Sequence, residues 1–458
     1  MCATQPEHDD EPAPFGAGGE ASSLTSGVFY APTAMHARNW SWLRATTFSS
    51  GFAVVTVVAF ADGGYFPETW AWMTLALASL AGIALLLRQD LVLGRHDFAG
   101  LVLLASFAGW VGLSAVWSTA PDDSLQEAGR SLIYVAAVFA FMLLVDRDRI
   151  REYLAGIAAA ATLVAGYSLG ERILGGEPIR SDPIQGTRLI EPLGYANALG
   201  ILASLGVLIS VGMAVHAGSR QSRAMWLASL LLLVPTFVWT ESRGSSLAII
   251  AGLCVLGVAE RQRLAALLPG SRRLHTAAGA AVAGVVVSAL AVTAFHTDRP
   301  LGPRVDYWSV AWSQWEENRW LGAGAGTFAR YWQREEMTVA VRDAHSLYLE
   351  TLAELGPVAL MLLLGALAVP LLAALNAREH PLTGTCLSAY TAYLVHAGVD
   401  WDWEMPAVTL SGLMCGVALL AVGRQAPDVI TIGVRGRRAF SLVALAIGGL
   451  ALAANLTD

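Results

Sequence analysis

One histidine lies where a long polar segment meets an apolar run, a position that suits proton-transfer chemistry. His345 occurs in Asp343-Ala-His345-Ser, at the start of that run. We expect Asp343 to cap the helix that follows and to place His345 in its first turn. Because a helix N-terminus disfavours a second positive charge, the imidazole should stay neutral and able to act as a general base. A histidine that merely caps a helix at a membrane interface explains the pattern equally well.

Two arginines have the properties of phosphate-binding groups. Arg243 lies in a tight connection between two apolar runs, where an unpaired charge is costly. Arg188 lies in a loop shaped by Gly, Pro and Asn that leads into another apolar run. Guanidinium groups bind phosphate oxygens through two parallel hydrogen bonds. The alternatives are a structural ion pair of Arg243 with Glu241 and one of Arg188 with Glu191.

Other polar residues at apolar boundaries are secondary candidates. Glu350 belongs to a polar stripe beside the histidine, with the spacing i, i+4, i+8. His396 and Asp400 are four residues apart, so they could hydrogen-bond each other on one helix face and serve as a supporting pair or as another base. Arg130 opens a predicted span, and we expect it to anchor the end of that helix.

The polar insert at residues 297–344 contains two further patterns. Its Trp and Arg residues recur at helical spacing: Arg304, Trp308, Trp312, Trp315 and Arg319. They predict an amphipathic helix on the membrane interface, with stacking on sugar rings or lipid headgroup binding as the alternative. The Gly-rich run 322–328 resembles a phosphate-binding loop. However, it lacks the expected lysine and a preceding strand, so a tight turn is favoured over a nucleotide site.

The elements that position these residues are predicted to be membrane spans. The chain has 458 residues, of which 55% are hydrophobic and only 14% charged, with a mean hydropathy of +0.53. Soluble domains carry nearer a quarter of charged residues, and apolar runs long enough to span a bilayer recur here. We therefore expect an all-α integral membrane protein with about 12–13 transmembrane helices and one large extracytoplasmic loop. The predicted spans are 46–62, 68–87, 98–117, 129–145, 152–170, 193–215, 224–240, 244–259, 276–296, 345–375, 382–400, 405–423 and 439–454.

Arginine placement predicts the topology. All 29 basic residues are Arg, which together with the many Ala and Gly residues suggests a GC-rich bacterial genome. The short connections on one side of the predicted spans carry most of these arginines, which places the N-terminus in the cytoplasm and the insert 297–344 outside. Residues 1–40 predict a disordered cytoplasmic tail, and residues 41–458 a polytopic membrane domain. The cysteines lack metal-ligand spacing, and no metal site is expected.

Four segments together resemble the O-antigen ligase and polymerase family of polytopic membrane glycosyltransferases. The segments are Trp239-Thr-Glu-Ser-Arg243-Gly, Arg304 with Trp308, Trp320-Leu-Gly-Ala-Gly-Ala-Gly-Thr-Phe328, and Ala344-His345-Ser-Leu-Tyr-Leu-Glu350-Thr-Leu-Ala-Glu354-Leu-Gly356. Their order and spacing agree with the family, and the resemblance covers residues 100–425. The chain departs from the family in having Ser346 where Asn often follows the histidine.

The resemblance implies an enzyme of the bacterial cytoplasmic membrane that acts on its outer face. A glycan would pass from a polyprenyl diphosphate to an acceptor hydroxyl, with inversion and without a metal or other cofactor. His345 matches the family's essential loop histidine, Arg243 and less closely Arg188 match arginines that bind the diphosphate, and Arg304 belongs to the same motif set. The implied partners are a polyprenyl-diphosphate-linked glycan, a glycan or lipid acceptor and the lipid bilayer, with no nucleic acid.

The chemistry of the outer face is compatible with this expectation. No nucleotide sugar is present there, so the donor must carry its own leaving group, and arginines can stabilise the charge that develops on a diphosphate. A neutral histidine can take the acceptor proton. Three alternatives remain open: polymerisation of lipid-linked repeat units, transport of an anionic solute, and a non-catalytic scaffold. Transporters place ionisable residues near the membrane midplane, whereas here they gather at the outer edge.

Overall fold

The computed structural model describes residues 40–87, 92–175, 185–267, 302–335, 339–377, 379–424, 429–431 and 433–455. The predicted span 276–296 and the predicted tail, except Trp40, lie outside these residues. The chain divides into two units, Met1–Ser41 and Trp42–Asp458. The second unit contains all the candidate site residues.

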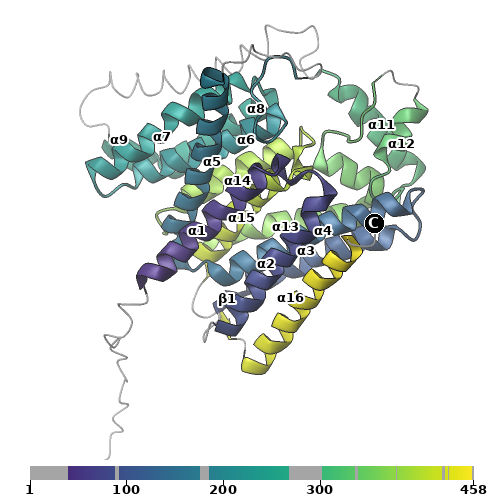
Figure 1. The fold of residues 1–458 in the computed structure, drawn as a ribbon, viewed down its shortest axis with the longest axis horizontal. Coiled ribbons are helices and arrows are strands. Elements are labelled where there is room, and N and C mark those ends of the chain that lie inside the picture. Colours follow the sequence, from purple (N-terminus) through teal and green to yellow (C-terminus); the bar gives the residue numbers. More distant parts are fainter. Residues whose placement is uncertain are drawn as a thin grey trace, which may run out of the picture. The chain divides into compact units, whose positions relative to one another are not determined.

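The described residues are mostly helical, and a helix occurs at each predicted span that falls within them (Figure 1). These helices are α1 (Trp40–Ala59), α2 (Pro67–Leu87), α3 (Arg95–Ser114), α4 (Pro121–Leu144), α5 (Ile150–Leu174), α6 (Ala196–Val215), α7 (Arg220–Trp239), α8 (Arg243–Ala259), α13 (Leu347–Asn376), α14 (Thr383–Ala397), α15 (Pro406–Gly423) and α16 (Val434–Asn455). The short helices are α9 (Arg261–Leu267), α11 (Arg304–Glu317) and α12 (Phe328–Arg334). Single 3₁₀ turns cover Asp62–Gly64, Arg147–Arg149 and Asp402–Glu404.

The expected fold class, an all-α integral membrane protein, is confirmed. Among the described helices, 8 are long and apolar enough to cross a membrane, and α1 and α8 contain shorter apolar stretches. The β-structure in the described part of the chain is one antiparallel pair, β1 (Val92–Gly94) with β2 (Val429–Thr431). This pair joins the start of α3 to the connection that precedes α16.

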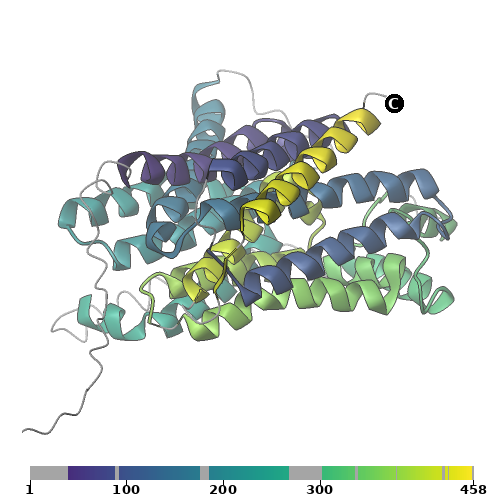
Figure 2. The ribbon, with the colours of Figure 1, turned by 90° about the horizontal axis from the view of Figure 1, so that it is seen from below.

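The helices in the middle of the bundle are enclosed by their neighbours. Within the 18-residue apolar stretch of each helix, 89% is buried in α6 and 94% in α15, against 17% in α7. α14 packs against α6, α8 and α15. Its contact with α15 depends on a small residue. A Cβ at Gly412 of α15 would lie 2.2 Å from the ring of Tyr393 on α14. Close approach at small residues is typical of helix packing in membranes. The C-terminal α16 packs along α2 (Figure 2).

The part of the predicted insert that is described folds as a small packed unit on α13. One face of α11 is buried, and α11 and α12 contact α13. The core of this unit consists of Tyr307, Val310, Ala311, Phe328, Trp332, Ala344 and Ala353. A helix with one buried face is therefore present where the Trp and Arg spacing predicts it, but it ends at Glu317, before Arg319. Its buried face carries Tyr307, Val310, Ala311 and Gln314 in place of the predicted Trp and Arg stripe.

Two helix boundaries differ from the predicted spans in ways that matter for the site. α4 begins at Pro121, well before residue 129, because Pro is favoured in the first turn and Asp122 and Asp123 suit a helix N-terminus. Residue 130 is consequently inside the helix. α13 is broken at Gly356, whose φ of 74° and ψ of −179° are not helical, and Pro357 starts its second part. The first part carries the glutamates of the predicted polar stripe.

Candidate active site

His345 lies just before α13 and not in its first turn, so the predicted capping by Asp343 is wrong. The helix begins at Leu347, and Ser346 is the N-cap, with its hydroxyl accepting the Leu349 N–H at 3.5 Å. Asp343 is buried and its side chain hydrogen-bonds Glu404, so it is not available to cap the helix. His345 has a φ of 55°, a left-handed conformation that costs a residue with a side chain about 1–2 kcal/mol.

The surroundings of His345 favour a neutral imidazole with one accepting nitrogen. Its Nδ1 is 3.1 Å from the carbonyl oxygen of Asp343, which can only accept a hydrogen bond. The hydrogen therefore lies on Nδ1, and Nε2 carries a lone pair. The ring packs against Tyr307 of α11 at a centroid distance of 4.6 Å. Burial lowers the pKa of His345 below its ordinary value, although the Asp400 carboxylate partly opposes the shift.

Asp400 connects three elements near this histidine. Its carboxylate is fully buried and accepts hydrogen bonds from Arg304 at 2.7 Å, Asn197 at 2.7 Å and Tyr195 at 2.9 Å. Burial opposes its ionisation, but Arg304, the two nearby histidines and the Tyr195 hydrogen bond together outweigh this effect and hold the pKa of Asp400 below its usual range. Arg304 also donates to the Val399 carbonyl at 2.6 Å. The guanidinium at the start of α11 is thus fixed in orientation.

The other two predicted arginines lie at the edges of the same network. Arg188 donates to Asn197 at 3.2 Å and to the Gln185 carbonyl at 3.0 Å. Arg243 is half-buried and is the first residue of α8. The residue after it, Gly244, faces the network: a Cβ there would lie 3.1 Å from the His396 ring and 3.5 Å from Asp400. The structure therefore brings together elements from the loop before α6 and from α8, α11 and α14.

The predicted pairing of His396 with Asp400 is wrong. α14 ends at Ala397, so Asp400 does not follow His396 by one helical turn. His396 Nε2 instead pairs with Asp402 at 2.8 Å, and both side chains are fully buried. His396 is therefore enclosed by protein and is not exposed at the surface.

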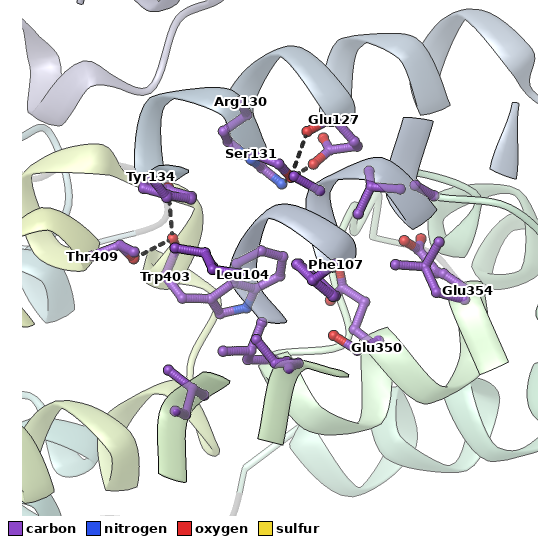
Figure 3. A pocket seen from close by; sticks show the side chains of 18 of the residues that line it. Leu104, Phe107, Glu127, Arg130, Ser131, Tyr134, Glu350, Glu354, Trp403 and Thr409 are labelled. Carbon is purple, nitrogen blue, oxygen red and sulfur yellow. Dashed lines mark hydrogen bonds and ion pairs between the residues drawn. The ribbon is translucent and has the colours of Figure 1, made fainter. Parts of the chain in front are cut away.

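Arg130 does not anchor a helix end, contrary to the prediction, because α4 begins at Pro121 and Arg130 lies inside it. It is buried and forms ion pairs with Glu127 and, at 2.8 Å, with Glu404. Its guanidinium also lies 5.1 Å from the ring of Trp403. Arg130, Glu127 and Trp403 line a cavity of about 70 Å³ between α3, α4, α13 and α15, with Glu350 and Glu354 on its other side (Figure 3).

The Gly-rich run forms the expected tight turn. Gly322, Gly324 and Gly326 have positive φ, and a Cβ at Gly322 would lie 2.2 Å from the backbone of Glu354. The Glu354 carboxyl accepts the N–H groups of Gly326 and Phe328, both at 2.8 Å. The N–H groups that would cradle a phosphate in a nucleotide loop therefore bind the chain's own glutamate.

Two groups of described side chains have the composition of metal ligands. They are His396 with Asp400 and Asp402, and Asp343 with Glu350 and Glu404. In each group an arginine already supplies a counter-charge, Arg304 in the first and Arg130 in the second. The negative charge of each group is thus compensated by a guanidinium group, which does not favour binding of a divalent cation as well.

Sequence patterns did not single out several residues of the site. Tyr307, Asn197 and Glu404 contact the predicted residues across large sequence separations. For Glu404 a signal existed, because it ends an Asp-Trp-Asp-Trp-Glu run at the boundary of a predicted span. Asn197 belongs to the loop pattern around Arg188, but its contact with Asp400 depends on the tertiary fold, and no local pattern distinguishes Tyr307.

Comparison with models of known protein families gives one match. Residues 227–364 match the family described as O-antigen ligase. The matched segment contains Arg243, Arg304, His345 and Glu350, whereas Arg188, Arg130, His396 and Asp400 lie outside it. None of the curated proteins compared with the chain matches it. The family resemblance indicated by the sequence motifs is confirmed over this segment.

Proposed function

We propose that this chain, whose residues 227–364 match the O-antigen ligase family, transfers a glycan from a polyprenyl-diphosphate donor to an acceptor hydroxyl. The observation that carries the proposal is His345, held neutral by burial with Nε2 unprotonated, beside a network that contains Arg304 and Arg188. A base next to fixed guanidinium groups suits a reaction in which a hydroxyl loses a proton while a phosphate leaves.

In the proposed step, the acceptor oxygen attacks the anomeric carbon as its proton passes to Nε2 of His345. The bond between that carbon and the diphosphate oxygen breaks, and its electron pair goes to the diphosphate. A single displacement inverts the configuration at the anomeric carbon. The imidazolium that forms is stabilised by the nearby Asp400 carboxylate, which raises the proton affinity of His345.

The proposed diphosphate site consists of Arg304, Arg188 and Arg243. Arg304 is oriented by Asp400 and the Val399 carbonyl before any ligand binds, so little reorganisation is needed when charge develops. Arg188 connects to the same carboxylate through Asn197. Three guanidinium groups offer the positive charge that a metal ion provides in other phosphate-transfer sites, so we propose a reaction that is independent of metal.

We place this site on the outer face of the bacterial cytoplasmic membrane, with the N-terminus in the cytoplasm. The distribution of arginines over the connections supports this orientation. Exposed aromatic and apolar residues of the insert, Trp312, Trp320 and Leu321, suit the interfacial region where a lipid-linked donor presents its diphosphate.

The same geometry serves polymerisation of lipid-linked repeat units, in which the acceptor hydroxyl belongs to another donor-linked glycan. Reconstitution in liposomes with a polyprenyl-diphosphate oligosaccharide and an acceptor separates the two reactions. One added glycan per acceptor indicates a ligase, and a ladder of products indicates a polymerase. Flux of a labelled anion without glycan transfer contradicts both and favours a transporter.

A further inference from the structure

The turn that carries His345 depends on buried side chains of the next helix. The left-handed conformation of His345 is uncommon for a residue with a side chain and persists only where the surroundings fix it. The residue before it, Ala344, is fully buried and donates its N–H to Glu350 at 2.7 Å. Glu350 lies one turn into α13 and is itself buried. The carboxyl of Glu350 therefore ties the turn back onto the helix that it precedes.

Glu350 belongs to a cluster of three carboxyl groups. Oxygens of Asp343, Glu350 and Glu404 all lie within 4.8 Å of one another, and the three residues are buried. Three carboxyl groups this close cannot all be ionised, so they share at least one proton. The side chains of Asp343 and Glu404 hydrogen-bond each other, which requires one of the two to donate.

The location of the shared proton follows from the neighbouring charges. Burial, together with the Glu404 carboxylate, raises the pKa of Asp343 well above its ordinary value. Burial opposes ionisation of Glu404 too, but the Arg130 guanidinium, the Asp343 hydrogen bond and Arg342 together outweigh it and lower the pKa of Glu404. Of this hydrogen-bonded pair, Asp343 therefore carries the proton and donates it to an anionic Glu404, which in turn is held by Arg130 at 2.8 Å.

The other titratable and charged groups around the cluster come from four parts of the chain. They are Glu127 from α4, Arg342 from the segment before the turn, Tyr65 from the α1–α2 connection, and Glu354 from α13. The Glu354 carboxyl is committed to two backbone N–H groups. The contact of the cluster with the turn itself is the hydrogen bond from the Ala344 N–H to Glu350.

We propose that Asp343, Glu350 and Glu404 form a proton-sharing carboxyl clamp that holds His345 in the orientation needed for a base. Within the clamp, Glu350 is a positioning residue that fixes the backbone at Ala344, and protonated Asp343 joins the turn to Glu404. This role rests on the proposed function, because it concerns the presentation of the same histidine. The clamp adds a second condition on activity: His345 must be neutral, and Asp343 must keep its proton.

The first test compares Glu350→Ala with Glu350→Gln in the full-length protein in detergent or liposomes. The glutamine oxygen can still accept the Ala344 N–H, whereas alanine cannot. We expect Glu350→Ala to lower kcat by about 100-fold with little change in KM for the donor, since small misplacements of a catalytic group have effects of this size. We expect Glu350→Gln to recover most of the rate. Glu317→Ala, at an exposed position of α11, is the matched control.

A second readout reports on the turn independently of transfer. The rate of His345 modification by diethyl pyrocarbonate, followed by peptide mass spectrometry, should change in Glu350→Ala and return in Glu350→Gln. An unchanged modification rate and an unchanged kcat in folded Glu350→Ala would overturn the clamp. If His345→Ala retained full transfer while Glu350→Ala still altered the modification rate, the proposed function would fail and the clamp would stand.

The shared proton is tested by Asp343→Asn. If Asp343 carries the shared proton, the wild-type rate should decline at alkaline pH. The asparagine amide donates to Glu404 without a titrating proton, so we expect the variant to stay active and to lose this decline. Asp343→Ala should be slow at all pH values because the link to Glu404 is absent. An alkaline decline in Asp343→Asn identical to that of wild type contradicts the assignment of the proton to Asp343.

Discussion

Removing the Glu354 carboxyl should destabilise the protein more than any exposed glutamate of the insert. This side chain accepts two backbone N–H groups, those of Gly326 and Phe328, each at 2.8 Å. It thereby joins the Gly-rich turn, and with it α11 and α12, to α13. The two backbone bonds beside it, from Ala323 to Ala353 and from Gly324 to Glu354, do not involve the side chain and remain in any variant.

The size of the effect follows from the number of donors that lose a partner. A buried donor left unsatisfied costs about 1–3 kcal/mol, so Glu354→Ala should lower the free energy of unfolding by about 2–6 kcal/mol. Glu354→Gln keeps one accepting oxygen and presents an N–H₂ group to the other donor. Its cost should be about half as large, roughly 1–3 kcal/mol, on the same basis.

The assay is denaturant unfolding in detergent, with intrinsic Trp fluorescence as the signal. Glu317→Gln provides the matched control, because this side chain is exposed and its ion pair with Arg334 is also exposed. Such a substitution usually changes stability by no more than about 0.5 kcal/mol. If Glu354→Ala and Glu317→Gln unfold at the same denaturant concentration, the proposed link between the turn and α13 is wrong.

Three further predictions concern the buried ion pair of Arg130 with Glu404, the break in α13 at Gly356 and the proposed base His345. Arg130→Met leaves the buried Glu404 without its partner and should cost about 3–5 kcal/mol, measured by thermal unfolding, with partial recovery in the double variant with Glu404→Gln. Gly356→Ala should destabilise the fold by about 1–3 kcal/mol in the same assay, because the residue has a φ of 74° and its Cβ would lie 2.3 Å from the Trp320 oxygen. Burial lowers the pKa of His345 below its ordinary value of 6.5. The acid decline of kcat/KM in a pH–rate profile should therefore lie below pH 6.5. A decline centred above that value contradicts the assignment of His345 as the base.

The sequence predicted the helices well because their apolar runs are long and separated by charged or Gly-rich connections. It also predicted a helix in the insert from its Trp and Arg spacing, although not the face that is buried. The errors occurred where helix ends are decided by polar residues. α4 begins at Pro121, with two acids in its first turn, and α13 begins at Leu347 because Ser346 caps it.

Partners within the site could not be predicted from local spacing. Asp400 was paired with His396 on the assumption of a continuous helix, but α14 ends at Ala397 and the carboxylate turns to Arg304 instead. The contact of His345 with Tyr307 joins residues from α11 and from the turn before α13, and depends on how the insert folds. Residue types indicated the chemistry of the site, whereas tertiary packing determined which residue contacts which partner.

The most direct test of the account is the transfer rate of His345→Ala in liposomes. The substrate is a polyprenyl-diphosphate oligosaccharide with an acceptor, and both the glycan product and free polyprenyl diphosphate are measured. A general base contributes about 10²–10⁴-fold, so the variant should lose at least 100-fold in rate while it folds and binds the donor as wild type does. A folded His345→Ala protein that transfers glycan at the wild-type rate would contradict the central claim.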